Sequence, residues 1–218
     1  MHELNRRRVL GGAATLALGT TVGLASPASA SPLAISAAYP LPDGEFGFVR
    51  GAETFHTDGG LRPLADRFPS LPASFTRGVD TAYTLLDGTH GFVRGADVHH
   101  TGWRRGAGRT LAGQFPTLPR SFTRGVDTAY VLPNGAYGFV RGGEVHHTDW
   151  APGSVRPLAE RFPTLPGHFA SGTTAAYVLP NWVHVFVRGD EVHHTDLGRK
   201  AVRRLADEFP ELPQSWLA

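Results

Sequence analysis

The sequence predicts an all-β fold: a four-bladed β-propeller with short helical turns at the ends of the blades. Two observations lead to this prediction. Four short sequence patterns each occur four times in constant order, which is typical of repeat architectures. Each copy is also rich in β-branched and aromatic residues interrupted by glycine turns, which is typical of short strands. A closed ring of such units needs no capping repeat, whereas a linear array would leave both ends exposed.

Each of the four patterns is marked by one recurring residue. The pattern Phe-Val-Arg-Gly ends at Gly51, Gly95, Gly142 and Gly189. A histidine-bearing pattern ends at Thr57, Thr101, Thr148 and Thr195. The pattern Leu-Ala-x-x-Phe-Pro-x-Leu-Pro begins, every 47 residues, at Leu64, Leu111, Leu158 and Leu205. An alanine-rich pattern ends at Tyr39, Tyr83, Tyr130 and Tyr177. We therefore expect repeats over about residues 34–77, 78–124, 125–171 and 172–218.

The second repeat shows the expected order of elements within a blade. Residues 79–85 are β-branched and aromatic, and they end at a turn signal, so they predict a first strand. Residues 89–94 and 97–101 predict a hairpin with a two-residue glycine turn. That register places opposite charges across the hairpin in every repeat, which favours the pairing. The pairs are Arg50/Glu53, Arg94/Asp97, Arg141/Glu144 and Arg188/Glu191.

The last part of each repeat is a loop and a helical turn. The first copy is three residues shorter between the histidine pattern and the Leu-Ala pattern, so this segment is a loop, with room for a fourth strand. Residues 62–68 resemble one or two turns of helix, and the Phe-Pro pair ends them.

The first thirty residues predict an export signal. Paired arginines precede an apolar run, and Ala28-Ser29-Ala30 precedes Ser31, which is the layout of a bacterial signal peptide with a small-residue cleavage site. The Arg7-Arg8 pair resembles a twin-arginine signal. A transmembrane anchor is the alternative, but glycines interrupt the run. We expect a secreted protein whose mature domain is residues 31–218, with no membrane partner after cleavage.

Composition narrows the function classes. Three of the 21 Lys and Arg residues and one of the 19 Asp and Glu residues lie in residues 1–30, so the remainder carries 18 of each. A balanced charge does not support a nucleic-acid partner. The chain has no cysteine, which excludes disulfides, thiolate metal sites and cysteine nucleophiles. Neither a Ser-His-Asp order, nor a phosphate-binding glycine loop, nor a His-Glu-x-x-His pattern stands out.

These repeats resemble the hemopexin-like repeat family. Val79-Asp80-Thr81-Ala82 matches the opening of the family's blade, Phe-Val-Arg-Gly its second strand and turn, and Leu-Ala-Asp-Arg-Phe-Pro its short helix. The resemblance covers about residues 34–218 and implies a four-bladed propeller. Family members usually close the ring with a disulfide, which this chain cannot form. In haem-binding animal members the haem lies between two such domains.

The resemblance also implies an ion site on the propeller axis. In the family, backbone carbonyls from the first strand of each blade hold ions in the channel, and oxygen ligands suit hard cations. By position these residues are Ser36, Asp80, Asp127 and Thr174. A water-filled channel is the alternative.

Histidines on the third strand are the second candidate site. The hairpin register places His99, His146 and His193 opposite phenylalanines, with His90 and His184 diagonally across the ladder from two of them. The remaining candidates, His56, His100, His147 and His194, lie on the other face of the strand. Glycines opposite three of them leave room for the imidazole. The expected geometry argues against a single central four-histidine site, because the third strand of a propeller blade lies roughly 10 Å farther from the axis than the first.

Three uses of these histidines remain open. They could bind a divalent metal (Ca, Zn or Cu) or haem together with a residue of the next blade. They could act as acid/base pairs, His90 with His99 and His184 with His193. They could also pack between blades, each satisfied by a carbonyl or a threonine.

The loops offer a third candidate. The four tryptophans are interpreted as lying outside repeat-equivalent positions, and Trp103 and Trp150 fall in the variable loops. Trp103 beside Arg104 and Arg105 predicts a patch for an anionic or aromatic ligand, with an ordinary loop aromatic as the alternative.

Three functions follow as hypotheses. The sequence favours a secreted, non-catalytic propeller that binds a metal ion, haem or another small molecule through inter-blade histidines. The first alternative is an enzyme of secondary metabolism that uses the paired histidines. The second is an extracellular module that binds proteins or mediates adhesion.

Overall fold

The structure, a computed structural model, describes residues 34–198 and 201–217. Residues 1–30, the predicted export signal, lie outside the described residues. All elements below belong to the compact unit that spans residues 32–218.

The described residues form four antiparallel sheets of four strands each, which we call blades 1 to 4. Blade 1 holds β1 (Ala37–Pro40), β2 (Phe46–Arg50), β3 (Glu53–His56) and β4 (Gly60–Pro63). Blade 2 holds β5 (Thr81–Thr84), β6 (His90–Arg94), β7 (Asp97–His100) and β8 (Arg109–Thr110). Blade 3 holds β9 (Thr128–Val131), β10 (Tyr137–Arg141), β11 (Glu144–His147) and β12 (Arg156–Pro157). Blade 4 holds β13 (Ala175–Val178), β14 (His184–Arg188), β15 (Glu191–His194) and β16 (Arg203–Arg204).

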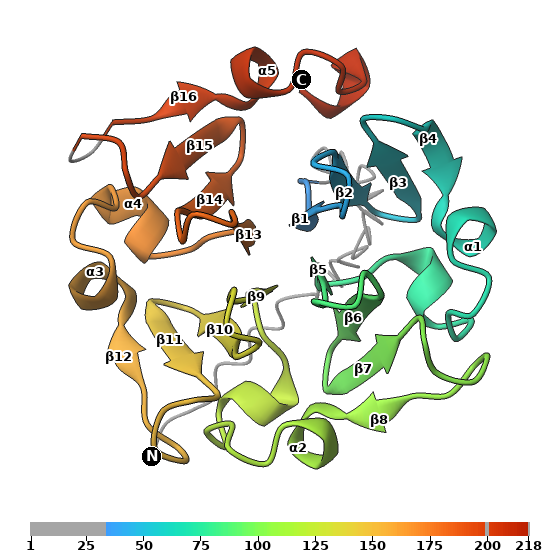
Figure 1. The fold of residues 1–218 in the computed structure, drawn as a ribbon, viewed down its shortest axis with the longest axis horizontal. Helices are drawn as coiled ribbons and strands as arrows, with labels where there is room; N and C mark the ends of the chain where they lie inside the picture. The colour runs from blue at the N-terminus through green and yellow to red at the C-terminus, as the bar shows by residue number, and fades with distance from the viewer. Residues whose placement is uncertain (1–33, 199–200, 218) are drawn as a thin grey trace, which may run out of the picture. The chain divides into compact units, whose positions relative to one another are not determined.

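The blades surround an axis, with β1, β5, β9 and β13 innermost (Figure 1). The predicted four-bladed propeller is therefore confirmed, and the loop with room for a fourth strand does form one in each blade. The predicted helical turns follow the fourth strands as α1 (Leu64–Arg67), α2 (Leu111–Gln114), α3 (Leu158–Arg161) and α5 (Leu205–Glu208). A second short turn follows each of them: η1 (Phe75–Arg77), η2 (Phe122–Arg124), α4 (Gly167–Ala170) and η3 (Gln214–Trp216). None of the described helices is long and apolar enough to cross a bilayer.

The predicted hairpin register is correct, but the arginines at its end bond differently. Arg94 lies opposite Asp97 across the turn, as the sequence predicts. Its Nη1 donates to the carbonyl oxygens of Gly78 (2.7 Å) and Ser74, in the linker that leads into the blade. Arg141 does the same with Gly125 (2.8 Å). These arginines hold each linker against its blade. Hydrogen bonds from a charged donor to a carbonyl oxygen are stronger than an exposed ion pair.

Glycine on the second strand makes room for tyrosine rather than for histidine. A Cβ on Gly91 would lie 2.1 Å from the ring of Tyr83, and Gly47 and Gly138 are equally close to Tyr39 and Tyr130. The prediction that these glycines leave space for the imidazoles is therefore wrong. In blades 1 to 3 the tyrosine ring crosses the second strand at this glycine, whereas in blade 4 Tyr177 faces Val185.

Apolar packing closes the ring between blades 4 and 1. Phe209, at the end of α5, packs against Phe46 and Phe48 of β2, with ring centroids 5.1 and 4.8 Å apart. Arg50 donates to the carbonyl oxygen of Ser215. The same aromatic contact joins Phe68 to Phe92 at the boundary between blades 1 and 2. Closure without a disulfide thus repeats the packing used at another boundary of the ring.

Candidate ligand sites

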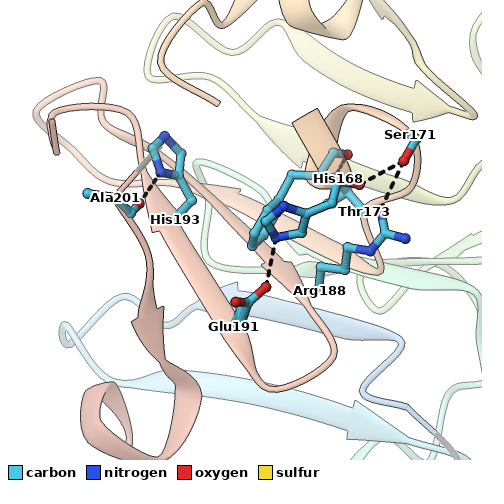
Figure 2. A network of polar contacts seen from close by, with 8 residues as sticks. His168, Ser171, Thr173, Arg188, Glu191, His193 and Ala201 are labelled. Atoms are coloured by element: carbon cyan, nitrogen blue, oxygen red, sulfur yellow. Dashed lines mark hydrogen bonds and ion pairs between the residues drawn. The ribbon is translucent and has the colours of Figure 1, made fainter. Parts of the chain in front are cut away.

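One set of histidines holds the loop that leads to the fourth strand. His99, His146 and His193 are fully buried. The Nδ1 atom of His146 donates to the carbonyl oxygen of Ser154 (2.6 Å), and that of His193 donates to Ala201 (2.6 Å; Figure 2). His99 makes the equivalent bond to Ala107. This is the carbonyl-satisfied packing role that the sequence left open.

A second set bonds the tyrosines of the first strand. The Tyr39 hydroxyl lies 3.0 Å from His56 Nε2. The distance is 3.0 Å for Tyr83 with His100 and 2.9 Å for Tyr130 with His147. In blade 4, Nε2 of His194 lies 3.1 Å from Glu208 Oε1 instead. These contacts bury polar atoms in pairs, which removes the cost of burying them alone.

His90 and His184 contact the preceding blade rather than the histidines with which the sequence pairs them. The ring of His90 packs against Tyr39 (5.3 Å) and Phe68 (5.4 Å). His184 packs in the same way against Tyr130 (5.3 Å) and Phe162 (4.7 Å).

The imidazoles of His90 and His184 also act on histidines of the preceding blade, because they contribute to lowering the pKa of His56 and His147, respectively. Burial lowers the pKa of His56, His90, His100, His147 and His184 to about 4, so these rings are neutral near pH 7.

Trp103 and Trp150 occupy equivalent positions in blades 2 and 3, 47 residues apart, which corrects the interpretation from sequence. Trp103 packs on His100 with ring centroids 4.5 Å apart, and the Arg109 guanidinium lies 4.7 Å from the centroid of the Trp103 ring. Trp150 makes the same stack with His147 (4.4 Å) and Arg156 (4.8 Å). The cation on the Trp103 ring is therefore Arg109 rather than the neighbouring Arg104 or Arg105. Both indoles are engaged in stacks that repeat between blades, which favours the role of an ordinary loop aromatic.

One end of the axis opens into a charged cavity, which we call the polar mouth. Its volume is about 650 Å³. The four residues that the family resemblance singles out, Ser36, Asp80, Asp127 and Thr174, all line it. Arg124, Arg141 and Arg188 complete its charged lining.

The charged residues of the polar mouth differ in how far they are bonded. Asp80 Oδ2 accepts a hydrogen bond from the Gly95 amide (2.6 Å), and Asp127 Oδ2 accepts one from Gly142 (2.6 Å). Arg188 donates to the Ser171 hydroxyl (3.2 Å; Figure 2). Arg124 is exposed and makes no hydrogen bond or ion pair with any other described residue. Its guanidinium is therefore available to a ligand.

The other end of the axis opens into an apolar cavity of about 340 Å³, which we call the apolar mouth. Leucine and proline from the turns that follow the inner strands line it, among them Leu41, Leu86, Leu132 and Leu179. Between the two mouths, residues of the four inner strands leave a cavity of only about 10 Å³, which is at most the space of one water molecule. The mouths are therefore two separate sites.

Solved structures supply the comparison with known proteins. No family model and no curated protein matches the chain. It is similar to the hemopexin fold protein CP4 from cow pea, with 19% identity and a TM-score of 0.68 over 83% of this chain and 96% of that one. It is also similar to the seed albumin LS24 from Lathyrus sativus, with 16% identity and a TM-score of 0.72 over 86% of this chain and 100% of that one.

A plant lectin with two metal binding sites from Cicer arietinum is similar as well, with 15% identity and a TM-score of 0.67 over 81% of this chain and 95% of that one. The chain has the hemopexin fold. At these identities the likeness establishes the fold and leaves the function to the sites.

The next question is whether the described side chains could bind a metal ion. Within residues 34–198 and 201–217, no group of three or more His, Asp or Glu side chains could hold a metal ion. The imidazoles do not fit zinc, copper or haem, since carbonyls and hydroxyls already engage most of their nitrogens. Nε2 of His146, His184 and His194 is buried without a hydrogen-bond partner, but these three imidazoles form no group that could hold a metal ion. At the polar mouth, Ser36, Asp80, Asp127 and Thr174 carry oxygen atoms of the kind that hard cations prefer, but three arginines share the same lining.

The sequence analysis missed Trp182. The turn between the first and second strands has a glycine in the left-handed region in three blades: Gly44, Gly88 and Gly135, with φ of 88°, 79° and 85°. Blade 4 places Trp182 there, with φ of 67° and 50% of its surface exposed. Alignment of the repeats shows Asn-Trp where the others have Asp-Gly or Asn-Gly, so the signal was present in the sequence.

Proposed function

We propose that this protein is a non-catalytic, carbohydrate-binding propeller that takes an acidic sugar at its polar mouth. One observation carries the proposal: the free guanidinium of Arg124 shares a cavity of about 650 Å³ with the carboxylates of Asp80 and Asp127. Cavities of this size hold small-molecule ligands.

The charged side chains of the polar mouth indicate which class of sugar it would bind. A ligand carboxylate would accept two parallel hydrogen bonds from Arg124, the strongest geometry for this pair. Ligand hydroxyls would donate to Asp80 and Asp127, which act only as acceptors when ionised. A bound Ca²⁺ would add positive charge beside the same carboxylates. A sugar that carries both a carboxylate and hydroxyls would therefore make more hydrogen bonds to this lining than a neutral sugar would.

Two of the similar structures point to the same ligand class. One is the lectin from Cicer arietinum, and another is an albumin from the same plant showing hemagglutination, with 15% identity and a TM-score of 0.68. One is named a lectin and the other is described as showing hemagglutination, and on that basis we propose carbohydrate binding for this chain.

The inter-blade histidines are the weaker candidate for a ligand site. His99 and His193, which the acid/base and metal hypotheses both need, have no exposed surface. A ligand could reach them only if the blades separated, whereas the polar mouth is open. We therefore place the ligand on the axis.

Export by the twin-arginine route is part of the proposal. The expected product is a mature protein that begins at Ser31. N-terminal sequencing of protein recovered from the culture medium of a producing cell checks this, and intact residues 1–30 would contradict it.

The test of the polar mouth uses two equivalent arginines. Arg124 ends η2 and lines the cavity, while Arg77 ends η1, is equally exposed and does not line it. Titration calorimetry with trigalacturonate should show binding to the wild type and to Arg77→Ala, and at least about tenfold weaker binding to Arg124→Ala, the cost of one charged bidentate contact. Absence of wild-type binding, or equal binding by both variants, would contradict the proposal.

A further inference from the structure

Trp182 departs from the repeat in a way that packing does not explain. A non-glycine residue in the left-handed region is uncommon, and for a bulky residue it is an outlier that the rest of the structure must hold in place. The glycines of the other three blades adopt the same conformation without that strain. Because the fold does not gain stability from a half-exposed indole at this position, we expect Trp182 to contact a ligand.

The position of Trp182 is at the apolar mouth. Its amide donates to the Leu179 carbonyl (2.9 Å), which places it in the same turn as Leu179 and Pro180. Both of these residues line the cavity, as does Gly88, the residue of blade 2 that is equivalent to Trp182. Leu86 is 69% exposed on the same mouth. Trp182 thus belongs to a turn that borders a cavity of about 340 Å³ lined by leucine and proline.

The rim of the apolar mouth is formed by four turns, which hold Asp43, Asp87, Asn134 and Asn181. Each uses Oδ1 to accept from the amide two residues ahead, which fixes the side chain. Asp43 and Asp87 keep Oδ2 as a further acceptor, whereas the second terminal atom of each asparagine is a donor, and that of Asn134 donates to Asp149 (3.4 Å). Residues 41–45, 85–89, 132–136 and 179–183 contain no Lys or Arg. The rim therefore favours ligands that donate hydrogen bonds and disfavours anions.

We propose that the apolar mouth is a second binding site, which takes a flat, uncharged aromatic molecule bearing hydroxyl groups and stacks it on Trp182. Offset stacking on the indole and burial against the leucines hold the ring. The hydroxyls donate to the carboxylate oxygens of Asp43 and Asp87. A charge on the ring system would lose its hydration against the apolar lining without gaining a partner there.

A matched pair of ligands tests the class. Methyl gallate is flat, uncharged and hydroxylated, and gallate is the same ring with a carboxylate. In equilibrium dialysis the wild-type protein should bind methyl gallate at least about tenfold more tightly than gallate, since the carboxylate meets an acidic rim. Equal binding of the two, tighter binding of the cation dopamine or of methyl glucoside, or no binding of methyl gallate would overturn the proposal.

Variants at Trp182 test the site. Trp182→Gly restores the residue of the other three blades, so it should fold with an unchanged or higher Tm and yet lose at least about tenfold in affinity for methyl gallate. Trp182→Phe keeps a ring and should lose less. Arg124→Ala, at the opposite mouth, should bind methyl gallate like the wild type, which separates this site from the acidic-sugar site. Unchanged affinity in Trp182→Gly would overturn the assignment.

Discussion

The blade interfaces and the mouths of the channel use polar residues in opposite ways. At the interfaces, histidine and tyrosine are buried and bonded to each other or to carbonyls, as in the 2.9 Å contact of Tyr130 with His147. At the mouths, Arg124 and Trp182 are exposed. Trp182 departs from the pattern of the repeat, and Arg124 lines the cavity while its equivalent Arg77 does not. Equivalent bonds recur from blade to blade in the first region, whereas single residues break the symmetry in the second.

This contrast explains why the abundance of histidine does not by itself indicate a ligand site. Histidine recurs because an imidazole offers one donor and one acceptor on a flat ring, which suits a crowded interface between sheets. The ring position of His90 and His184 is filled by Phe46 and Tyr137 in the other blades, so packing requires a ring there and not an imidazole. Recurrence of a residue in every blade thus indicates a role in the scaffold.

Acid should damage the interfaces most. Five buried histidines have a pKa of about 4, below the value of 6.5 expected in the unfolded chain. The unfolded state therefore binds more protons between these values. Stability is full above pH 6.5 and falls as the pH drops toward 4. Each ring contributes about 1–2 kcal/mol after allowance for solvent screening, so Tm should fall by at least about 10 °C on going from pH 7.5 to pH 5. Scanning calorimetry checks this, and a constant Tm over that range would refute the assignment of these rings as buried and neutral.

Loss of a hydroxyl partner should have the next largest effect. Tyr130→Phe leaves His147 Nε2 buried without its hydrogen-bond partner at 2.9 Å. A buried polar atom without a partner lowers the free energy of unfolding by about 1–3 kcal/mol. Tyr177→Phe is the matched control, because His194 in that blade contacts Glu208 instead. Urea unfolding should show a clear loss in the first variant and a smaller one in the second. Equal losses would show that the tyrosine–histidine bond is not what stabilises the interface.

Replacement of a half-satisfied imidazole should have the smallest effect, and it should be favourable. His184 Nε2 is buried without a partner, and the equivalent residue of blade 1 is Phe46. His184→Phe should therefore stabilise the protein by about 1 kcal/mol at pH 7 and weaken its response to acid. The same urea titrations measure both changes. A destabilised variant would mean that the imidazole has a function at that interface which the packing does not reveal.

Particular residues show what sequence reasoning could reach. The repeat patterns and the Gly95 turn fixed the strands and the register, because the turn length determines which residues face each other. The polar mouth was reached only through family resemblance. The partners of His90 were missed, since its contacts lie on the preceding blade and depend on how two sheets pack, which the pattern of one strand does not contain. Trp182 was missed because it was compared with other tryptophans rather than with the glycines it replaces.

The central claim is that ligands bind at the mouths and that the histidines build the scaffold. The most direct test titrates trigalacturonate and methyl gallate into two double variants, His90→Phe/His184→Phe and Arg124→Ala/Trp182→Gly. The first should bind both ligands within about twofold of the wild type, and the second should lose about tenfold or more for each. Loss of binding in the histidine variant, with wild-type affinity in the mouth variant, would contradict the claim.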